Sequence, residues 1–291
     1  MTGYQVKKGL VLEGGAMRGM FTAGVLDVFM ENGIKFDNVI GVSAGACFGC
    51  NYVSGQIGRT IRYNVKYATD DRYCSFKSLI KTGDIFGAEF CYHMLPDVLD
   101  KFDGEAFVNS GIPFYVVVTD VMTGEAGYHR MTDAGYEELE WMRASASLPL
   151  VSNVVEIGGG KYLDGGMSDA IPLKASEALG CKINVTILTQ PRGYRKAPTK
   201  FMWFVKWKYK EYPNMVRALK ARHIMYNEEL DYCFGREKAG FNFVICPKSP
   251  LPIDRICHDP LVLRETYDLG RREAEEHLPG ILRYFESHEE G

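Results

Sequence analysis

Apolar positions along the first two thirds of the chain follow two different periods. Short, mostly apolar runs with the length of buried strands occupy residues 8–12, 38–42, 114–119 and 181–188. Apolar residues at helical spacing follow the first two runs, over residues 19–31 and 44–54. Because strands and helices alternate in this way, the pattern predicts an α/β fold with a mainly parallel central sheet covered by helices on both faces.

Turn residues add two further elements. Met122-Thr123-Gly124-Glu125 predicts a hairpin directly after the strand at 114–119. Pro172 suits the first turn of a helix that continues to Leu179, because the N–H that proline lacks would have no partner there.

A candidate nucleophile stands at the end of the second strand. Gly41-Val42-Ser43-Ala44-Gly45 has the G-x-S-x-G pattern, and it leads at once into the helix at 44–54. Glycines on both sides of the serine leave room for a sharp turn that exposes the Ser43 hydroxyl at its tip. The same pentapeptide also occurs in ordinary strand-to-helix turns, so other segments must support a chemical role.

A glycine-rich loop, Glu13-Gly14-Gly15-Ala16-Met17-Arg18-Gly19, joins the first strand to the first helix. Bare N–H groups beside a helix N-terminus favour negative charge. The Gly-Lys-Ser/Thr of a P-loop is absent and Ala16 interrupts the dinucleotide fingerprint, so nucleotide binding is not expected. An oxyanion hole formed by the N–H groups of Gly15, Ala16 and Ala44 fits better, with a turn used only for packing as the alternative.

Arg18 follows the proposed oxyanion donors. Its guanidinium could hold a substrate phosphate with two hydrogen bonds. In the structural alternative it pairs with a nearby carboxylate, Asp27 or Glu31.

A third glycine-rich segment, residues 158–166, contains Asp164-Gly165-Gly166 and follows Ala144-Ser145-Ala146-Ser147-Leu148-Pro149. Its glycines would let the Asp164 carboxylate approach another loop, although Asp-Gly-Gly is also an ordinary turn. Together with residues 13–19 and 41–45, these segments resemble the patatin-like phospholipase family over roughly the first 190 residues. The resemblance implies a three-layer α/β sandwich, Ser43 as nucleophile, Asp164 as base, and hydrolysis of lipid acyl esters. Ala16 departs from the family, which usually has glycine there.

The residue chemistry also favours a Ser-Asp dyad over a triad. None of the six histidines (His93, His129, His223, His258, His277 and His288) sits in a recognisable motif. Polar or charged surroundings indicate surface or capping residues at positions 93, 129, 277 and 288. An aspartate is a weak base with an ordinary pKa of about 3.9. It therefore needs partial desolvation and a direct hydrogen bond to the serine hydroxyl.

Composition limits the remaining possibilities. The chain has 291 residues, of which 46% are hydrophobic, and no linker divides it. We expect residues 1–190 to form the catalytic core and residues 191–291 to complete the same domain as a helical cap rich in basic and aromatic residues. A formal charge of −3 and the lack of a nucleic-acid motif argue against nucleic-acid binding. No oligomeric state is indicated.

Residues 200–222 interleave basic and aromatic side chains, including Trp203 and Trp207. This composition suits the headgroup level of an anionic membrane. A packed lid or a subunit contact is the alternative.

Residues 1–8 lack the apolar stretch of a signal peptide, and no run of 18 apolar residues occurs. We therefore expect a cytosolic protein whose contact with the inner membrane surface, if any, is peripheral. Eight cysteines without zinc-site spacing favour buried, reduced thiols over metal or redox sites.

The sequence thus predicts a serine acyl-ester hydrolase, acting on lipid esters as a phospholipase A or lysophospholipase does, with no metal or organic cofactor. Two alternatives remain: a thioesterase or non-lipid carboxylesterase, and a non-catalytic regulatory or membrane-adaptor protein on the same fold.

Overall fold

The computed structural model describes residues 6–289, so residues 1–5 of the N-terminal segment considered above lie outside the described residues. Its centre is an eight-stranded sheet in the order β5-β6-β3-β2-β1-β7-β8, with β4 on the free edge of β3. The parallel strands are β1 (Lys8–Leu12), β2 (Asn38–Val42), β3 (Phe114–Asp120), β7 (Ile183–Ile187) and β8 (Asn242–Ile245). The antiparallel strands are β4 (Ala126–Met131), β5 (Val155–Ile157) and β6 (Gly160–Asp164).

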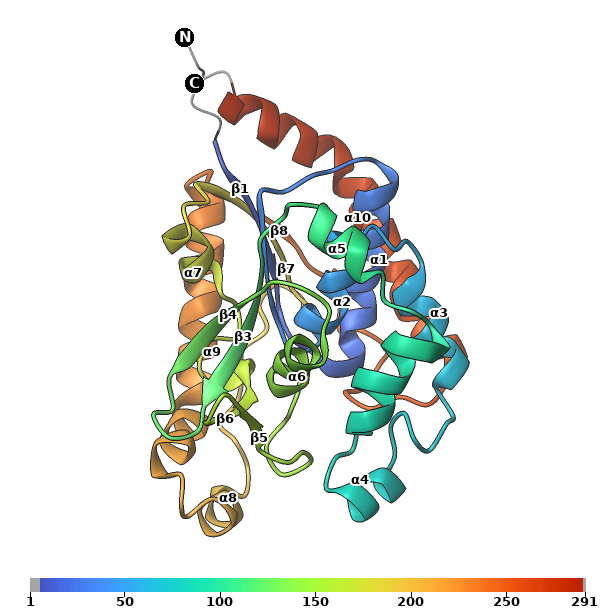
Figure 1. Ribbon diagram of the computed structural model, residues 1–291. Helices are drawn as coiled ribbons and strands as arrows, with labels where there is room; N and C mark the ends of the chain where they lie inside the picture. The colour runs from blue at the N-terminus through green and yellow to red at the C-terminus, as the bar shows by residue number, and fades with distance from the viewer. Residues whose placement is uncertain (1–5, 290–291) are drawn as a thin grey trace.

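Helices cover both faces of the sheet, as the sequence predicts (Figure 1). One face carries α1 (Gly19–Glu31), α2 (Ala44–Val53), α6 (Tyr136–Ser145) and α10 (Pro260–Glu289). The opposite face carries α7 (Leu173–Ala178) and α9 (Pro213–Lys238). The side chains of β1 and β2 alternate between the two resulting cores, which confirms the three-layer α/β architecture.

Shorter helices lie beyond these layers, on the side of α1 and α2 and around the ends of the strands (Figure 1). They are α3 (Arg59–Tyr67), α4 (Phe76–Thr82), α5 (Gly104–Asn109) and α8 (Met202–Lys208), the 3-10 helices η1 (Ala16–Arg18) and η3 (Gly165–Met167), and the π-helix η2 (Phe90–Leu99). Within residues 6–289, no helix combines the length and apolar character that a membrane span needs.

The predicted elements agree closely with the observed ones. The strands at 8–12 and 38–42 and the helix at 19–31 have the predicted bounds, and β3 and β4 form the predicted hairpin. Pro172 caps α7 at its N-terminus, one position before the helix begins. The sequence pattern does not predict that β6 pairs with β3 or that β8 pairs with β7, because the strands of each pair are far apart in the sequence.

Helices α1 and α10 cross in close contact because each presents a glycine to the other. A β-carbon at Gly270 of α10 would overlap the carbonyl oxygen of Phe21, and one at Gly24 of α1 would overlap that of Tyr267. The two backbones therefore approach where no side chain fits. This contact holds the C-terminal helix on the layer that contains the glycine-rich loop.

We predict that Gly270→Ala lowers the free energy of unfolding by about 1–3 kcal/mol, the usual cost of overpacking. Gly235→Ala in α9 is the matched control, because a β-carbon there meets nothing within 4 Å. The control should be neutral or stabilising, since alanine is the better helix former. Urea unfolding of both variants measures the difference, and equal stabilities would contradict the close contact.

Candidate active site

Two distant segments reach one place because they share an edge of β3. Strand β2 pairs with β3 as far as Val42, which lies opposite Val117. Strand β6 takes over at the next position, where Asp164 lies opposite Val118. Strand β4 occupies the other edge over the same residues, so β2 and β6 must follow one another along this one. Ser43, directly after Val42, is thereby brought beside Asp164.

Ser43 sits on a strained turn. Its φ is 55° and its ψ is −122°, a conformation that L-residues seldom adopt. The flanking glycines are required, because a β-carbon at Gly41 would lie 2.6 Å from the carbonyl oxygen of Gly45, and one at Gly45 would overlap that of Leu12. The turn therefore has the geometry that the G-x-S-x-G pattern predicts.

Ser145 fills the gap that opens where β2 leaves β3. Its hydroxyl accepts a hydrogen bond from the Ser43 N–H at 2.8 Å and donates one to the Val117 carbonyl oxygen at 2.6 Å. Both backbone groups would otherwise be buried without a partner, which costs about 1–3 kcal/mol for each group. Ser145 thus fixes the turn that carries Ser43.

Asp164 is buried, with 2% of its surface exposed. Its Oδ1 accepts a hydrogen bond from the Gly166 N–H at 2.8 Å, while Oδ2 has no partner of hydrogen-bond geometry within residues 6–289. Burial raises the pKa of the carboxyl group, and the Arg222 guanidinium and the nearby Ser43 hydroxyl partly offset that rise. A buried carboxylate with one free oxygen toward Ser43 has the properties of a proton acceptor.

The glycine-rich loop lies against the same turn. A β-carbon at Gly14 would be 2.9 Å from that of Ser43, and Ala16 has a φ of 49°. This left-handed conformation favours glycine, which accounts physically for the family preference noted above. Within residues 6–289, the N–H groups of Gly15, Ala16 and Ala44 make no hydrogen bond, so all three are free to receive a ligand oxygen.

Glu13 anchors this loop, a role that the sequence did not indicate. Its Oε1 accepts a hydrogen bond from the Tyr226 hydroxyl at 2.5 Å, and its Oε2 accepts one from the Thr189 N–H at 2.6 Å. Two distant segments thereby hold the loop in place.

Arg18 is paired with neither carboxylate considered for it. Asp27 accepts hydrogen bonds from the Tyr267 hydroxyl and the Gly58 N–H, and Glu31 pairs with Arg271. The structural alternative with those partners is therefore wrong. Arg18 instead lines a small pocket together with Ser43 and Asp164.

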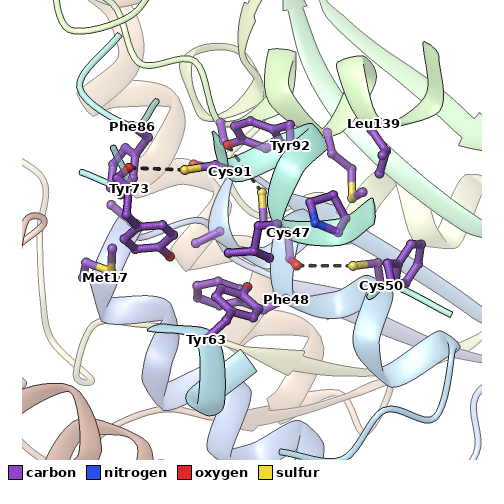
Figure 2. Close-up of a pocket in the computed structure, with 18 of the residues that line it drawn as sticks. Met17, Cys47, Phe48, Cys50, Tyr63, Tyr73, Phe86, Cys91, Tyr92 and Leu139 are labelled. Atoms are coloured by element: carbon purple, nitrogen blue, oxygen red, sulfur yellow. Dashed lines mark hydrogen bonds between the residues drawn. The ribbon is translucent and has the colours of Figure 1, made fainter. Parts of the chain in front are cut away.

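A larger, apolar cavity opens on the other side of Ser43. Its volume is about 830 Å³ including the open mouth, and its walls include Met17, Phe48, Tyr92 and Leu139 (Figure 2). Burial raises the pKa of the Cys47 thiol in this wall to about 12 and that of Cys50 to about 11. At neutral pH these two cysteines are therefore protonated, and they act as small apolar residues.

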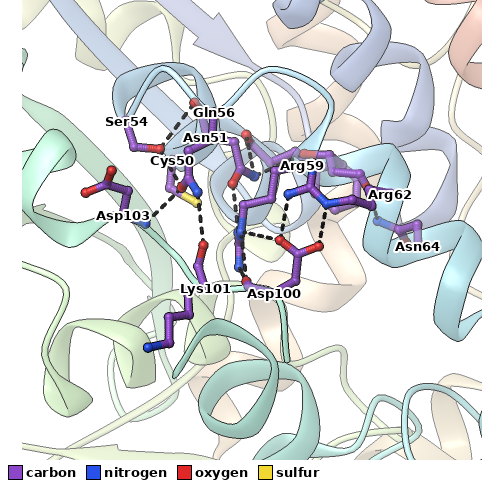
Figure 3. A network of polar contacts seen from close by, with 12 residues as sticks. Cys50, Asn51, Ser54, Gln56, Arg59, Arg62, Asn64, Asp100, Lys101 and Asp103 are labelled. Carbon is purple, nitrogen blue, oxygen red and sulfur yellow. Dashed lines mark hydrogen bonds and ion pairs between the residues drawn. The ribbon is translucent and has the colours of Figure 1, made fainter. Parts of the chain in front are cut away.

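A polar network lies next to this cavity (Figure 3). Arg59 is one of the residues that line the cavity. Its guanidinium donates to the Asn51 side chain at 2.7 Å and to the Asp100 backbone carbonyl oxygen at 2.6 Å. Its remaining charge is balanced by the Asp100 carboxylate at 3.5 Å. Because the guanidinium is satisfied by protein groups, the apolar cavity meets no unpaired charge here.

No histidine lines either pocket beside Ser43 in the part of the chain that is described. His93, expected near the surface, is buried and lies 2.9 Å from Glu140. Arg222 is the residue that sequence reasoning missed, because its position at the end of a basic segment suggested a membrane role. Its Nε donates to the Gly166 carbonyl oxygen at 2.5 Å, within the site.

The rest of the basic and aromatic segment forms α8 and the start of α9. Val205 and Tyr209 anchor α8 in a small core, and the Tyr209 hydroxyl accepts a hydrogen bond from the Leu150 N–H at 2.8 Å. Trp203 and Trp207 point outward and are 72% and 69% exposed. The segment is therefore packed through one side only.

The chain is similar to several known proteins. A family model described as "Patatin-like phospholipase" matches residues 10–176, and a domain of unknown function (DUF6363) matches residues 212–286. The uncharacterized protein YjjU of Escherichia coli (strain K12) is 29% identical over 270 residues, 90% of this chain and 74% of that protein.

Relatives from eukaryotes match a smaller part of the chain. Lysophospholipase NTE1 of Eremothecium gossypii is 28% identical over 60% of this chain, which corresponds to 11% of its own length. Among solved structures, VipD from Legionella pneumophila aligns over 94% of this chain and 67% of its own, with 13% identity and a TM-score of 0.43.

The matched residues 10–176 contain the glycine-rich loop, the Ser43 turn and the Asp164 strand. Since that match spans more than half of the chain, the protein belongs to the patatin-like phospholipase family.

Proposed function

We propose that this protein is a serine acyl-ester hydrolase that acts on lipid esters with a Ser43-Asp164 dyad. The observation that carries the proposal is the position of Ser43. Ser43 lines the apolar cavity, and it also lines the small pocket whose walls include the buried Asp164. The members of the patatin-like family are lipid ester hydrolases, and some relatives are named as lysophospholipases.

The cycle begins when Asp164 Oδ2 accepts the Ser43 hydroxyl proton and the serine oxygen attacks the ester carbonyl carbon. The resulting oxyanion receives hydrogen bonds from the N–H groups of Gly15, Ala16 and Ala44. When the intermediate collapses, Asp164 returns the proton to the departing alcohol. Water then attacks the acyl-serine in the same way, with Asp164 again as base, and releases the fatty acid.

The apolar cavity supports a fatty acyl group as the acyl part of the substrate. Its labelled walls are aromatic rings, methionine, leucine and protonated thiols (Figure 2). Burying methylene groups there contributes about 0.8 kcal/mol for each. A short acetyl group would leave most of this volume unused.

Two exposed helices provide a way to reach lipid. Trp203 and Trp207 project from α8, while Phe76 and Ile80 project from α4 and are 71% and 87% exposed. Both helices lie at the same end of the molecule (Figure 1). Exposed lysines neighbour the rings on each helix: Lys77 and Lys81 on α4, and Lys206 and Lys208 on α8.

One loop joins the two helices to the site. Its Leu150 and Asn153 bond to Tyr209 after α8 and to Thr82 at the end of α4, and its neighbour Leu148 lines both pockets beside Ser43. We propose that this end of the molecule docks peripherally on anionic lipid, with the rings at headgroup level. The expectation of a cytosolic protein at the inner membrane surface stays a prediction.

Ser43→Ala and Asp164→Asn should each lower the hydrolysis of a short p-nitrophenyl ester by roughly 10³-fold or more, because neither residue has a substitute in the site. Ser287→Ala and Asp133→Asn are matched controls at exposed positions. A fluorophosphonate tag should label the Ser43 peptide of the wild type and leave Ser43→Ala unlabelled. Near-wild-type turnover by either folded site variant would remove the dyad, and the adaptor alternative predicts no turnover by any of the proteins.

The pH dependence should reveal the influence of Arg222 on Asp164. Because the guanidinium lowers the pKa of that carboxyl group, Arg222→Met should raise the pKa, so protonation inactivates the base at higher pH than in the wild type. The acid limb of kcat/KM should then move to higher pH. Arg222→Lys, which keeps the charge, should stay near the wild type, as should Lys220→Met on the same helix. An unmoved limb in Arg222→Met contradicts this electrostatic role.

Vesicle co-sedimentation tests the docking surface. Binding should rise with the fraction of anionic lipid and fall with salt, since each basic residue near the surface contributes about 1 kcal/mol of screened attraction. A Trp203→Ala, Trp207→Ala double variant should bind roughly tenfold more weakly, because it loses two interfacial rings. Leu282→Ser is the exposed control, because Leu282 lies near the C-terminal end of α10 and outside α4 and α8. Unchanged binding by the double variant would assign these rings to another contact.

A further inference from the structure

The small pocket on the other side of Ser43 is lined by four cationic side chains, Arg18, Lys196, Arg222 and Arg255. We propose that this cationic pocket binds a compact phosphate monoester carried by the acyl-ester substrate, so that acyl glycerol phosphates are the preferred substrate class. The inference rests on the proposed ester hydrolysis and adds the chemistry of the leaving alcohol.

The four cations lack ion-pair partners among the described residues, 6–289, although many other arginines of the chain form ion pairs. The Nε of Arg18 is buried without a hydrogen-bond partner. Arg222 donates only to a backbone carbonyl oxygen, and the Lys196 ammonium stacks over the Tyr226 ring at 4.1 Å. Arg18, Lys196 and Arg222 are partly buried and Arg255 is exposed. Unpaired cations that are partly withdrawn from water are stabilised when an anion joins them.

Only two carboxylates of the described chain, Glu13 and Asp164, line the same pocket as the four cations. Glu13 is held by Tyr226 and Thr189, and Asp164 accepts from Gly166 and faces Ser43. Positive charge is therefore in excess. Burial and the neighbouring Arg222 lower the pKa of Lys196 to about 7; Glu13 opposes them, and Arg255 and Arg18 add smaller lowering effects. A bound phosphate would remove this repulsion and stabilise the ammonium form.

The two pockets are placed to hold one molecule. Ser43, Ala16 and Leu148 belong to the walls of both, so an acyl chain in the apolar cavity and a phosphate among the cations would leave the ester at the serine. The cationic pocket has about 420 Å³ including its opening, roughly half of the apolar cavity. A glycerol phosphate therefore fits within it.

Phosphocholine fits this pocket poorly. A quaternary ammonium needs an open aromatic face, and the Tyr226 ring is already covered by Lys196. It would also lie among like charges, which discriminates against it. A phosphate monoester carries up to two negative charges and offers the arginines paired oxygens.

Three of the four cations lie outside residues 10–176, the segment that the patatin-like phospholipase model matches. Lys196 follows β7, Arg222 belongs to α9, and Arg255 precedes α10, all beyond residue 176. The catalytic groups and the headgroup pocket thus come from different parts of the chain. Three of the four cations that set headgroup preference accordingly come from residues 196–255, and Arg18 comes from the glycine-rich loop.

Three esters with one short acyl chain test the proposal: an acyl glycerol 3-phosphate, the matching glycerophosphocholine and the neutral acyl glycerol. The three esters are used at concentrations at which they stay monomeric, so differences in vesicle binding do not affect the comparison. The wild type should show a kcat/KM about tenfold or more higher for the phosphate monoester than for either other ester. Arg255→Gln and Lys196→Gln should each reduce that ratio about fivefold or more, while Lys238→Gln, exposed at the end of α9, should keep it.

A binding measurement separates this inference from the proposed hydrolysis. Glycerol 3-phosphate should raise the Tm of the Ser43→Ala protein by a few degrees, and Arg255→Gln in that background should remove the rise. If the wild type hydrolyses a p-nitrophenyl ester without preferring the phosphate ester, the inference is overturned and the hydrolase proposal stands. If no ester is hydrolysed but the Tm rise appears, the pocket is supported and the hydrolase proposal fails. An equal Tm rise with inorganic phosphate, with no substrate preference, would make the pocket a site for free phosphate and overturn the inference.

Discussion

Along one edge of β3, the partner strand changes from β2 to β6 after Val117, and the site depends on this exchange. A strand edge offers each backbone group one partner, so β6 can enter only where β2 has left. The serine turn begins where β2 leaves, and Asp164 arrives where β6 enters. The Ser145 hydroxyl bonds both backbone groups exposed at the junction, which keeps the exchange free of unsatisfied polar groups.

The sequence predicted those parts of the site that short-range sterics determine. Gly41 and Gly45 flank Ser43 because neither position has room for a β-carbon, and such a requirement is visible in five consecutive residues. Helix and strand bounds near the N-terminus were predicted equally well, since each element has its own apolar period. The pairing of Asp164 with Val118 joins residues 46 positions apart, and no local pattern encodes it.

The cations of the pocket beside Ser43 are a part of the site that the sequence did not predict. Lys196 and Arg222 belong to a run of basic residues that charge counting alone assigns to one surface. The structure separates them: Trp203 and Trp207 face outward, whereas Lys196 and Arg222 line a pocket beside Ser43. Which way a side chain points follows from the packing of α8 and α9 against distant segments, and that packing is set by Val205, Tyr209 and Tyr226. Composition cannot supply this information.

The order of these groups along the chain also determines when each becomes available during synthesis. Translation produces Ser43 and Asp164 well before Lys196, Arg222 and Arg255. A growing chain on the ribosome could therefore form the strained serine turn while the excess positive charge beside it is still missing. The glycine contact between α1 and α10 forms later still, because Gly270 must emerge before the two helices can meet. The complete charge pattern around the nucleophile thus appears only after Arg255 has been synthesised.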